Sequence, residues 1–252
     1  MPDHVRPLFA ANWKMHLGPE ETESFVRLFA DLHDERKDAR VVFFPPYLSV
    51  GSFVAASRTR PDLELGVQDV HQELSGAHTG AVSAPMAKQA RAGWALAGHS
   101  ERRREFGDDD VTVAAKVARI IEADLRPILC VGETLDEREA GQLESVLSRQ
   151  IEVVLDSLAP ESLPLLTYAY EPIWAIGTGR TASPDDAAQA HEVVRRGIGR
   201  CGGQGDAVIL YGGSVKPGNI EELLEAPGVD GVLVGGASLD PESFAAICAA
   251  GG

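Results

Sequence analysis

Residues 7–14 read PLFAANWK, and this stretch decides between the two folds that alternating strands and helices allow. A short apolar run without polar alternation is typical of a parallel strand that is covered on both faces. An open doubly wound sheet would usually place a glycine-rich GxGxxG turn after its first strand. Here the apolar run leads directly into Asn12, Trp13 and Lys14. The stretch therefore favours a closed barrel over an open dinucleotide-binding sheet.

The same alternation continues along the whole chain without a break in composition. Apolar runs that predict strands are followed by amphipathic segments that predict helices, at a spacing of roughly 30 residues. The predicted strands are residues 7–12, 40–44, 63–68, 93–97, 127–131, 163–170, 207–211 and 229–234. Predicted helices include residues 20–33, 111–124, 137–156 and 185–199, the last with Ser183 as N-cap and Pro184 at its first position. We therefore expect one α/β domain, a (β/α)8 barrel, over residues 1–252.

Composition and charge exclude several classes of protein. With 44% hydrophobic and 24% charged residues, the chain is expected to fold around a core without disulfide or metal support. The formal net charge of −15 would repel a polyphosphate backbone, which argues against nucleic acid as a partner. An acidic protein that binds a small phosphate must therefore concentrate hydrogen-bond donors in one pocket.

The expected location is the cytoplasm. Cys130, Cys201 and Cys248 are widely spaced, as is typical of buried thiols in a reducing compartment. The seven histidines are scattered, and no CxxC pattern occurs, so no metal site is expected. Residues 1–6 lack a secretory signal pattern, and no apolar run approaches the roughly 18 residues of a membrane span, so no membrane association is expected.

Polar side chains at the carboxyl ends of the predicted strands are the candidates for chemistry, because active sites of such barrels collect there. Asn12 ends the first predicted strand and Lys14 follows it. The two are expected to share a face, where Lys14 could anchor an anionic substrate. His99 follows a glycine turn and precedes a predicted helix start, whose dipole favours a neutral ring able to donate a hydrogen bond. Arg102 and its two arginine neighbours are expected to form ion pairs rather than contact substrate.

Glu171 closes the sixth predicted strand and is a further candidate for chemistry. The glycine-bearing residues 173–181 that follow could close over its carboxylate as a lid. Glycine-rich turns follow strands six, seven and eight, at residues 177–179, 212–214 and 235–236. Backbone N–H groups in such turns can approach a ligand closely, and barrels commonly bind phosphate after strands seven and eight. These turns predict a phosphate site.

Five stretches together resemble the signatures of the triosephosphate isomerase family, in that family's order. They read ANWKM at 11–15, GHSERR at 98–103, AYEPIWAIGTG at 169–179, YGGSVKP at 211–217 and GVLVGGASL at 231–239. The resemblance extends over residues 7–247 and implies a TIM barrel. It also implies that the chain interconverts dihydroxyacetone phosphate and D-glyceraldehyde 3-phosphate through an enediolate, in glycolysis and gluconeogenesis.

The resemblance also implies roles for individual residues. Glu171 would move the carbon-bound proton, and neutral His99 would polarise the carbonyl and shuttle hydroxyl protons. Lys14 and Asn12 would bind substrate and stabilise the developing oxyanion. The N–H groups that would hold the phosphate belong to Gly177, Ser214, Gly235 and Gly236. No cofactor, metal or nucleotide is implied.

A homodimer is the further expectation from the resemblance. Residues 68–85 are too long for a simple turn, and in the family the corresponding loop reaches into a twofold-related partner with a threonine that Thr79 matches. The family usually has a glutamate where this chain has Ala81, and that glutamate would pair with the arginine matching Arg102 across the interface. We therefore expect a dimer that lacks this ion pair. Two further positions depart from the family pattern: Arg180 stands where lysine is commoner, and Ala11 stands where glycine is frequent.

Three other functions are alternatives on the same scaffold. An isomerase of a four-carbon ketose phosphate, a tetrulose phosphate, would use the same residues and differ only in pocket width. A Schiff-base aldolase would need a lysine facing the pocket from a strand, where the sixth strand has Glu171. A non-catalytic phosphosugar-binding protein would have no reason to keep Lys14, His99 and Glu171 together.

Overall fold

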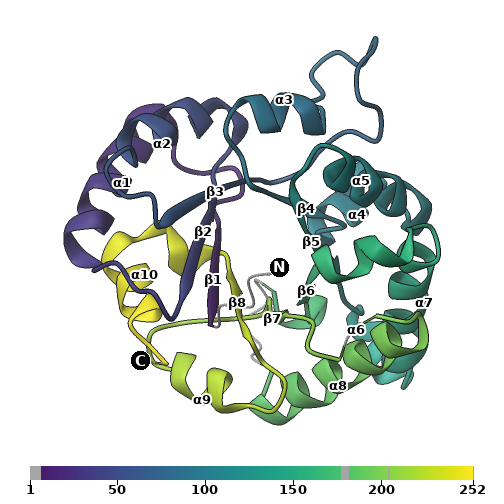
Figure 1. Ribbon diagram of the computed structural model, residues 1–252. Helices are drawn as coiled ribbons and strands as arrows, with labels where there is room; N and C mark the ends of the chain where they lie inside the picture. The colour runs from purple at the N-terminus through teal and green to yellow at the C-terminus, as the bar shows by residue number, and fades with distance from the viewer. Residues whose placement is uncertain (1–6, 177–181, 204, 252) are drawn as a thin grey trace.

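Eight parallel strands form a closed barrel in the computed structural model, which describes residues 7–176, 182–203 and 205–251 (Figure 1). Each strand pairs with its neighbours in sequence, and β1 pairs with β8 to close the sheet. The strands are β1 (Leu8–Asn12), β2 (Arg40–Phe44), β3 (Leu63–Val67), β4 (Trp94–Ala97), β5 (Arg126–Val131), β6 (Thr167–Tyr170), β7 (Ile209–Tyr211) and β8 (Gly231–Val234). The predicted fold class, a (β/α)8 TIM barrel, is confirmed.

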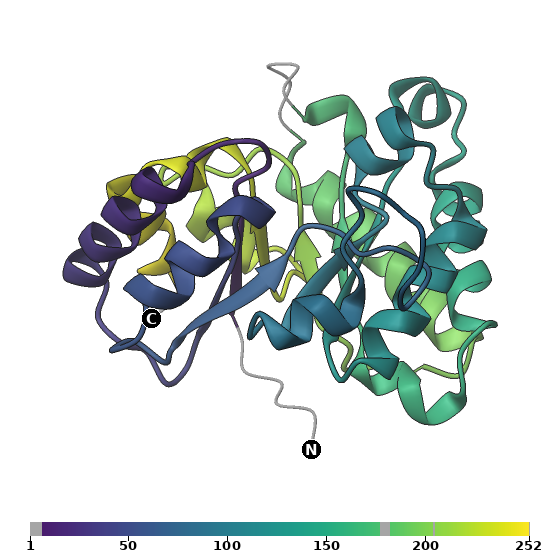
Figure 2. The same cartoon turned by 90° about the horizontal axis from the view of Figure 1, so that it is seen from above.

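Helices surround the barrel, and the first and last of them, α1 and α10, lie side by side (Figures 1 and 2). The α-helices are α1 (Pro19–Leu32), α2 (Val50–Ala56), α3 (Ala84–Gln89), α4 (Ser100–Phe106), α5 (Asp110–Glu122), α6 (Leu135–Glu139), α7 (Leu143–Leu155), α8 (Pro184–Arg200), α9 (Ile220–Glu225) and α10 (Pro241–Cys248). Short 3-10 helices are η1 (Tyr47–Ser49), η2 (Pro160–Leu165), η3 (Ile173–Ala175) and η4 (Gly236–Leu239). No helix in the described ranges is long and apolar enough to cross a membrane.

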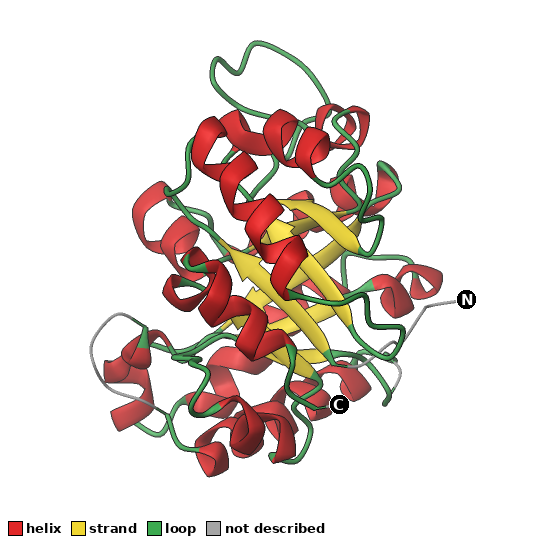
Figure 3. Ribbon diagram, turned by 90° about the vertical axis from the view of Figure 1, so that its left-hand side faces the viewer, coloured by secondary structure: helices red, strands yellow, loops and turns green. Residues whose placement is uncertain are grey.

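The strands lack polar alternation because both of their faces are buried. Along β1, Leu8 and Ala10 belong to the cluster inside the barrel, whereas Phe9 and Ala11 pack in the layer between sheet and helices. The strands in yellow are accordingly enclosed by helices (Figure 3). Burial on both faces removes the polar face that a half-exposed strand would need.

Most predicted bounds agree with the structure to within two residues, and two predicted elements differ more substantially. The strand predicted over residues 163–170 begins only at Thr167, because residues 160–165 form the 3-10 helix η2 with Pro160 at its start and Pro164 inside it. The helix predicted over 137–156 is divided into α6 and α7, since Gly141 adopts a left-handed φ of 68° between them. By contrast, α8 has Ser183 as its N-cap and a proline in its first turn, as predicted.

The parallel arrangement positions the candidate residues. Because all strands run in the same direction, their carboxyl ends lie at one end of the barrel. Asn12 ends β1, and Glu171 follows β6 directly. His99 follows β4 after a single glycine, Gly98.

Candidate active site

A pocket of 510 Å³ at the carboxyl ends of the strands brings most of the predicted site residues together. Its lining includes Asn12, Lys14, His99, Glu171, Ser214, Gly235 and Gly236. Gly177, the remaining predicted phosphate ligand, lies outside the described residues. Residues that are remote in sequence thus share one cavity, because each follows a different strand of the same barrel.

Lys14 is held in an unusual backbone conformation at the mouth of this pocket. Its φ is 52°, which is uncommon for a residue with a side chain. Its N–H donates to Asn12 Oδ1 at 3.0 Å, and its carbonyl accepts from Gln68 Nε2 at 2.8 Å. We predicted that Lys14 and Asn12 share a face because side chains alternate along a strand. Both residues line the pocket, but β1 ends at Asn12, so these two hydrogen bonds and not strand alternation hold Lys14.

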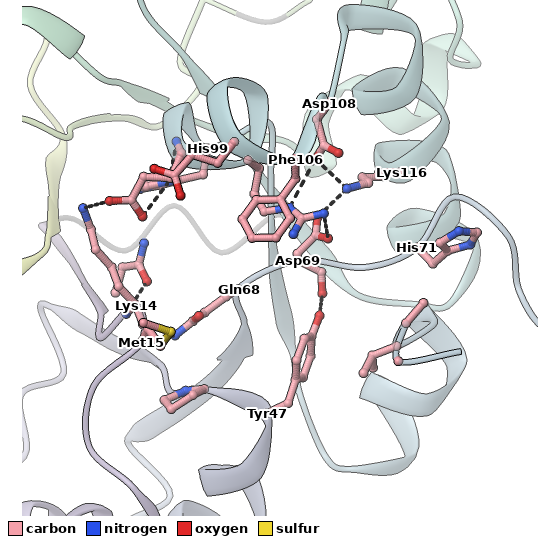
Figure 4. Close-up of a pocket in the computed structure, with 18 of the residues that line it drawn as sticks. Lys14, Met15, Tyr47, Gln68, Asp69, His71, His99, Phe106, Asp108 and Lys116 are labelled. Atoms are coloured by element: carbon pink, nitrogen blue, oxygen red, sulfur yellow. Dashed lines mark hydrogen bonds and ion pairs between the residues drawn. The ribbon is translucent and has the colours of Figure 1, made fainter. Parts of the chain in front are cut away.

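The Lys14 ammonium reaches across the barrel to Glu101 of α4. Nζ donates to Glu101 Oε1 at 2.8 Å, as one dashed line in Figure 4 shows. Burial raises the pKa of Glu101, but the hydrogen bond and charge of Lys14 outweigh it, so the pKa is lowered overall. Lys14 also lies beside Gly235, where a Cβ atom would come within 3.4 Å of Lys14 Cε. A lysine ammonium has three donor hydrogens, so Glu101 leaves others for a ligand.

His99 is the N-cap residue of α4, and its ring orientation follows from that position. Nδ1 accepts the N–H of Glu101 at 3.2 Å, so this nitrogen carries no proton. Nε2 lies 3.2 Å from Glu171 Oε1 and is the nitrogen left to donate. The turn before His99 requires Gly98, whose φ is 77°.

Glu171 is 2% exposed, and its carboxylate is held at both oxygens. Oε1 faces His99, and Oε2 accepts the N–H of Ser100 at 2.8 Å. The backbone of Glu171 is packed tightly against Gly132, where a Cβ atom would come within 1.8 Å of the Glu171 carbonyl oxygen. Only glycine fits beside Glu171 without displacing it.

Glu133, after β5, contacts residues on both sides of Glu171 in sequence, and the sequence analysis missed it. It is fully buried, and its Oε1 accepts from the Tyr170 hydroxyl and from Trp174 Nε1, both at 2.9 Å. Burial raises the pKa of Glu133, and Arg138, 3.6 Å away, opposes this effect. Glu133 thereby connects β5 and β6 to residue 174 at the start of the predicted lid. The sequence signal that could have identified Glu133 is a carboxylate two residues after a predicted strand.

Gln68 and Glu101 were also missed. Gln68 follows β3 and bonds the carbonyl groups of both Lys14 and Phe44, while Glu101 pairs with Lys14. Within the described residues, no group of three or more His, Cys, Asp or Glu side chains is placed to hold a metal ion. The predicted catalytic side chains in this pocket offer an amide, an imidazole, an ammonium and a carboxylate, from Asn12, His99, Lys14 and Glu171.

Comparison with known proteins gives a consistent family assignment. The family model described as "Triosephosphate isomerase" matches residues 7–251. A triosephosphate isomerase of Symbiobacterium thermophilum is 44% identical over 247 residues, covering 97% of this chain and 96% of that protein. Those of Moorella thermoacetica and Nitratidesulfovibrio vulgaris are each 45% identical, covering 96% of this chain and 97% and 99% of theirs. This chain therefore belongs to the triosephosphate isomerase family.

Proposed function

We propose that this chain is a triosephosphate isomerase, which interconverts dihydroxyacetone phosphate and D-glyceraldehyde 3-phosphate, a step of glycolysis and gluconeogenesis. One observation carries the proposal. The buried carboxylate of Glu171 lies 3.2 Å from His99 Nε2, in the pocket that Lys14 and the glycine turns after β7 and β8 also line. The family assignment supports the same function.

Glu171 is the base in this proposal. It takes the proton from the carbon beside the substrate carbonyl, which leaves an enediolate, and returns that proton to the adjacent carbon. A general base must lie within hydrogen-bonding reach of the proton it removes. Glu171 is buried and ordered by the Ser100 N–H, so its carboxylate is kept away from bulk water.

His99 donates from Nε2 to the substrate oxygens and moves a hydroxyl proton between them. The support is the hydrogen bond at Nδ1, which accepts from Glu101 and so leaves the proton of a neutral ring on Nε2. A neutral donor can give its proton to an enediolate oxygen and recover it from the neighbouring hydroxyl. The carbon and oxygen protons are then moved by two different groups.

Lys14 and Asn12 bind the substrate oxygens and stabilise the negative charge that develops on them. The backbone of Lys14 is held by hydrogen bonds to the side chains of Asn12 and Gln68, and Asn12 is 4% exposed at the end of β1. Holding the ammonium in place before the substrate binds lowers the cost of reorganisation in the reaction.

The phosphate binds to N–H groups of Ser214, Gly235 and Gly236, together with that of Gly177. Ser214, Gly235 and Gly236 line the same pocket as Glu171 and His99. The predicted lid is residues 173–181, of which 177–181 lie outside the described residues. In this proposal its role is to keep water from the enediolate. Glu133 fixes the start of this lid through Trp174.

The active form is a cytoplasmic homodimer in this proposal. The loop between β3 and α3 extends away from the barrel (Figures 1 and 3), and residues 79–81 at its tip are exposed. Large apolar side chains near its base are also exposed, among them Met15 at 93% and Phe106 at 64%. Such a gathering of exposed apolar side chains marks an interface. The three cysteines are free thiols, which fits a reducing compartment.

The test is steady-state turnover of D-glyceraldehyde 3-phosphate compared with erythrulose phosphates. We expect turnover of the triose, and loss of kcat by at least about 10²–10⁴-fold for Glu171→Ala with phosphate affinity largely kept. The matched control is Glu161→Ala, since Glu161 is exposed and remote from the pocket. Unchanged kcat in Glu171→Ala would refute the role of the base, and preferential turnover of the tetrulose would refute the substrate.

A further inference from the structure

A polar side chain lies within the buried and mainly apolar stripe of α7. This helix packs against β5, and its residues Leu147, Ile151 and Val154 are fully buried at helical spacing. Gln150 occupies a position in the same stripe and is only 5% exposed. Burying a carboxamide without hydrogen-bond partners is costly, so Gln150 needs partners inside the protein.

Gln150 binds both backbone polar groups of Gly132, the residue that follows β5. The Gly132 N–H donates to Gln150 Oε1 at 2.9 Å, and Gln150 Nε2 donates to the Gly132 carbonyl at 3.1 Å. An amide side chain carries a donor and an acceptor side by side, so it can bind both groups of one residue at once. Gly132 thereby also fixes which end of the amide is the oxygen.

These two hydrogen bonds take the place of a neighbouring strand. The carbonyl groups on either side of Gly132 accept N–H groups from the β6 side, that of Glu171 at 2.8 Å and that of Ile173 at 3.2 Å. Successive residues of a strand direct their backbone polar groups to opposite neighbours. Gly132 therefore faces the other side, where β4 has already ended at Ala97. Gln150 supplies there the donor and the acceptor that a longer β4 would have supplied.

Gly132 in turn determines where the backbone of Glu171 lies. A Cβ atom on Gly132 would come within 1.8 Å of the Glu171 carbonyl oxygen and 3.3 Å of its Cα, so the two backbones are in direct contact. The Glu171 carboxylate has close partners of its own, 3.2 Å away at His99 Nε2 and 2.8 Å away at the Ser100 N–H. A displacement of Gly132 would therefore change the position of a carboxylate whose geometry matters for proton transfer.

We propose that Gln150 is a positioning residue for the base of the reaction: by bonding both polar groups of Gly132, it fixes the backbone against which Glu171 packs. The inference rests on the proposed function, in which Glu171 moves the carbon-bound proton. Gln150 lies outside the lining of the active-site pocket, so it acts through Gly132 and not on the substrate. Its contribution is to the rate of proton transfer, whereas the phosphate site after β7 and β8 does not depend on it.

The first test separates kcat from KM. Gln150→Met keeps the length of the side chain but bonds neither polar group of Gly132. We expect kcat to fall about tenfold and KM to change by less than about twofold, because the turns that hold the phosphate are unaltered. The matched control is Gln142→Met, at the exposed N-cap of the same helix, which should keep both constants. Wild-type kcat in Gln150→Met would overturn the proposal.

The second test asks whether the loss passes through Glu171. In Glu171→Ala the positioned carboxylate is absent, so adding Gln150→Met should lower the residual kcat by less than about twofold. A further loss of about tenfold in this background would overturn the proposal, because Gln150 would then support the pocket as a whole rather than the base.

A third variant, Gln150→Glu, tests the hydrogen bonds themselves and carries the test if Gln150→Met does not fold. A protonated carboxylic acid has a donor and an acceptor, like the amide, whereas a carboxylate only accepts and repels the Gly132 carbonyl. Its kcat, divided by that of the wild type at the same pH, should therefore be near the wild-type value at about pH 5 and fall toward about pH 9. Gln142→Glu should show no such change. A ratio that is equal at both pH values would overturn the proposal.

Failure of the proposed function gives a different result. If the unaltered chain does not turn over triose phosphate, that function is wrong, and the position of Glu171 is then followed by NMR of protein with labelled glutamate carboxyl carbons. The signal that is missing from Glu171→Gln identifies the carboxylate. Gln150→Met should shift this signal and leave that of exposed Glu161 in place. An unmoved Glu171 signal would overturn the proposal.

Discussion

At the scale of single residues, His191 gives the protein a specific sensitivity to acid. The ring lies fully buried on α8, and its Nδ1 is 2.8 Å from the carbonyl oxygen of Gly228. Burial lowers its pKa from 6.5 to about 4. Between these values the unfolded chain takes up a proton that the folded ring excludes, so the stability from this group is complete above pH 6.5 and is lost toward pH 4.

We therefore expect the free energy of unfolding to fall on acidification, with His191 contributing a slope of at most about 1.4 kcal/mol per pH unit. In His191→Asn this part of the slope should disappear, whatever the variant's stability at neutral pH. Urea unfolding over this range, at one fixed protein concentration, measures the slopes. His16→Asn is the control, since His16 is exposed. Identical slopes in wild type and His191→Asn would contradict the assignment.

Gly132 is the second residue with a sharp prediction. A Cβ at this position would come within 1.8 Å of the Glu171 carbonyl oxygen, so Gly132→Ala must displace the backbone of the proposed base. We expect kcat to fall by about tenfold or more, because a small misplacement of a catalytic group is costly. Gly199→Ala is the control: Gly199 lies on α8 with open space around it, and alanine there should leave kcat unchanged. Wild-type kcat in Gly132→Ala would show that the position of Glu171 is not critical.

At the scale of elements, the start of α8 depends on a reciprocal cap. The Ser183 hydroxyl oxygen accepts from the Asp186 N–H at 3.1 Å, and Asp186 Oδ2 accepts the Ser183 N–H at 3.0 Å. Ser183→Ala should lower the free energy of unfolding by about 1 kcal/mol, because the Asp186 N–H in the first turn loses its partner. Denaturant unfolding measures this loss. Ser24→Ala, in the interior of α1, should have little effect, and equal losses in both variants would refute the cap.

At the scale of the whole molecule, two large apolar side chains are exposed beside the loop between β3 and α3. Met15 is 93% exposed and Phe106 64%, and both line an 860 Å³ cavity that Gly80, Ala81 and Val82 of the loop between β3 and α3 also line. We expect light scattering after size-exclusion chromatography to give about twice the 26.8 kDa mass of one chain at micromolar concentration. The physical reason for a dimer is that the second chain would cover these apolar side chains and remove them from water. A mass of one chain at that concentration would refute the homodimer.

The sequence by itself determined the barrel and most of the candidate site. Strands covered on both faces appear as apolar runs, and the residue that follows each run is placed at the carboxyl end by strand direction alone. Asn12, His99 and Glu171 were predictable for this reason, and so was the cap at Ser183. The boundaries of helices and strands were less predictable. The helix predicted over 137–156 is interrupted by the left-handed backbone of Gly141, and β6 begins late because a 3-10 helix with Pro164 precedes it.

Only the tertiary structure decided the contacts between elements that are distant in the chain. Gln68 and Asn12 hold Lys14 at a positive φ, Glu133 joins Tyr170 to Trp174, and Asp69 forms ion pairs with Arg102 and Lys116. No local pattern marks these partners, because hydropathy and turn signals depend on neighbours in sequence. Ion pairs and hydrogen bonds depend on distances that arise only when the barrel has closed.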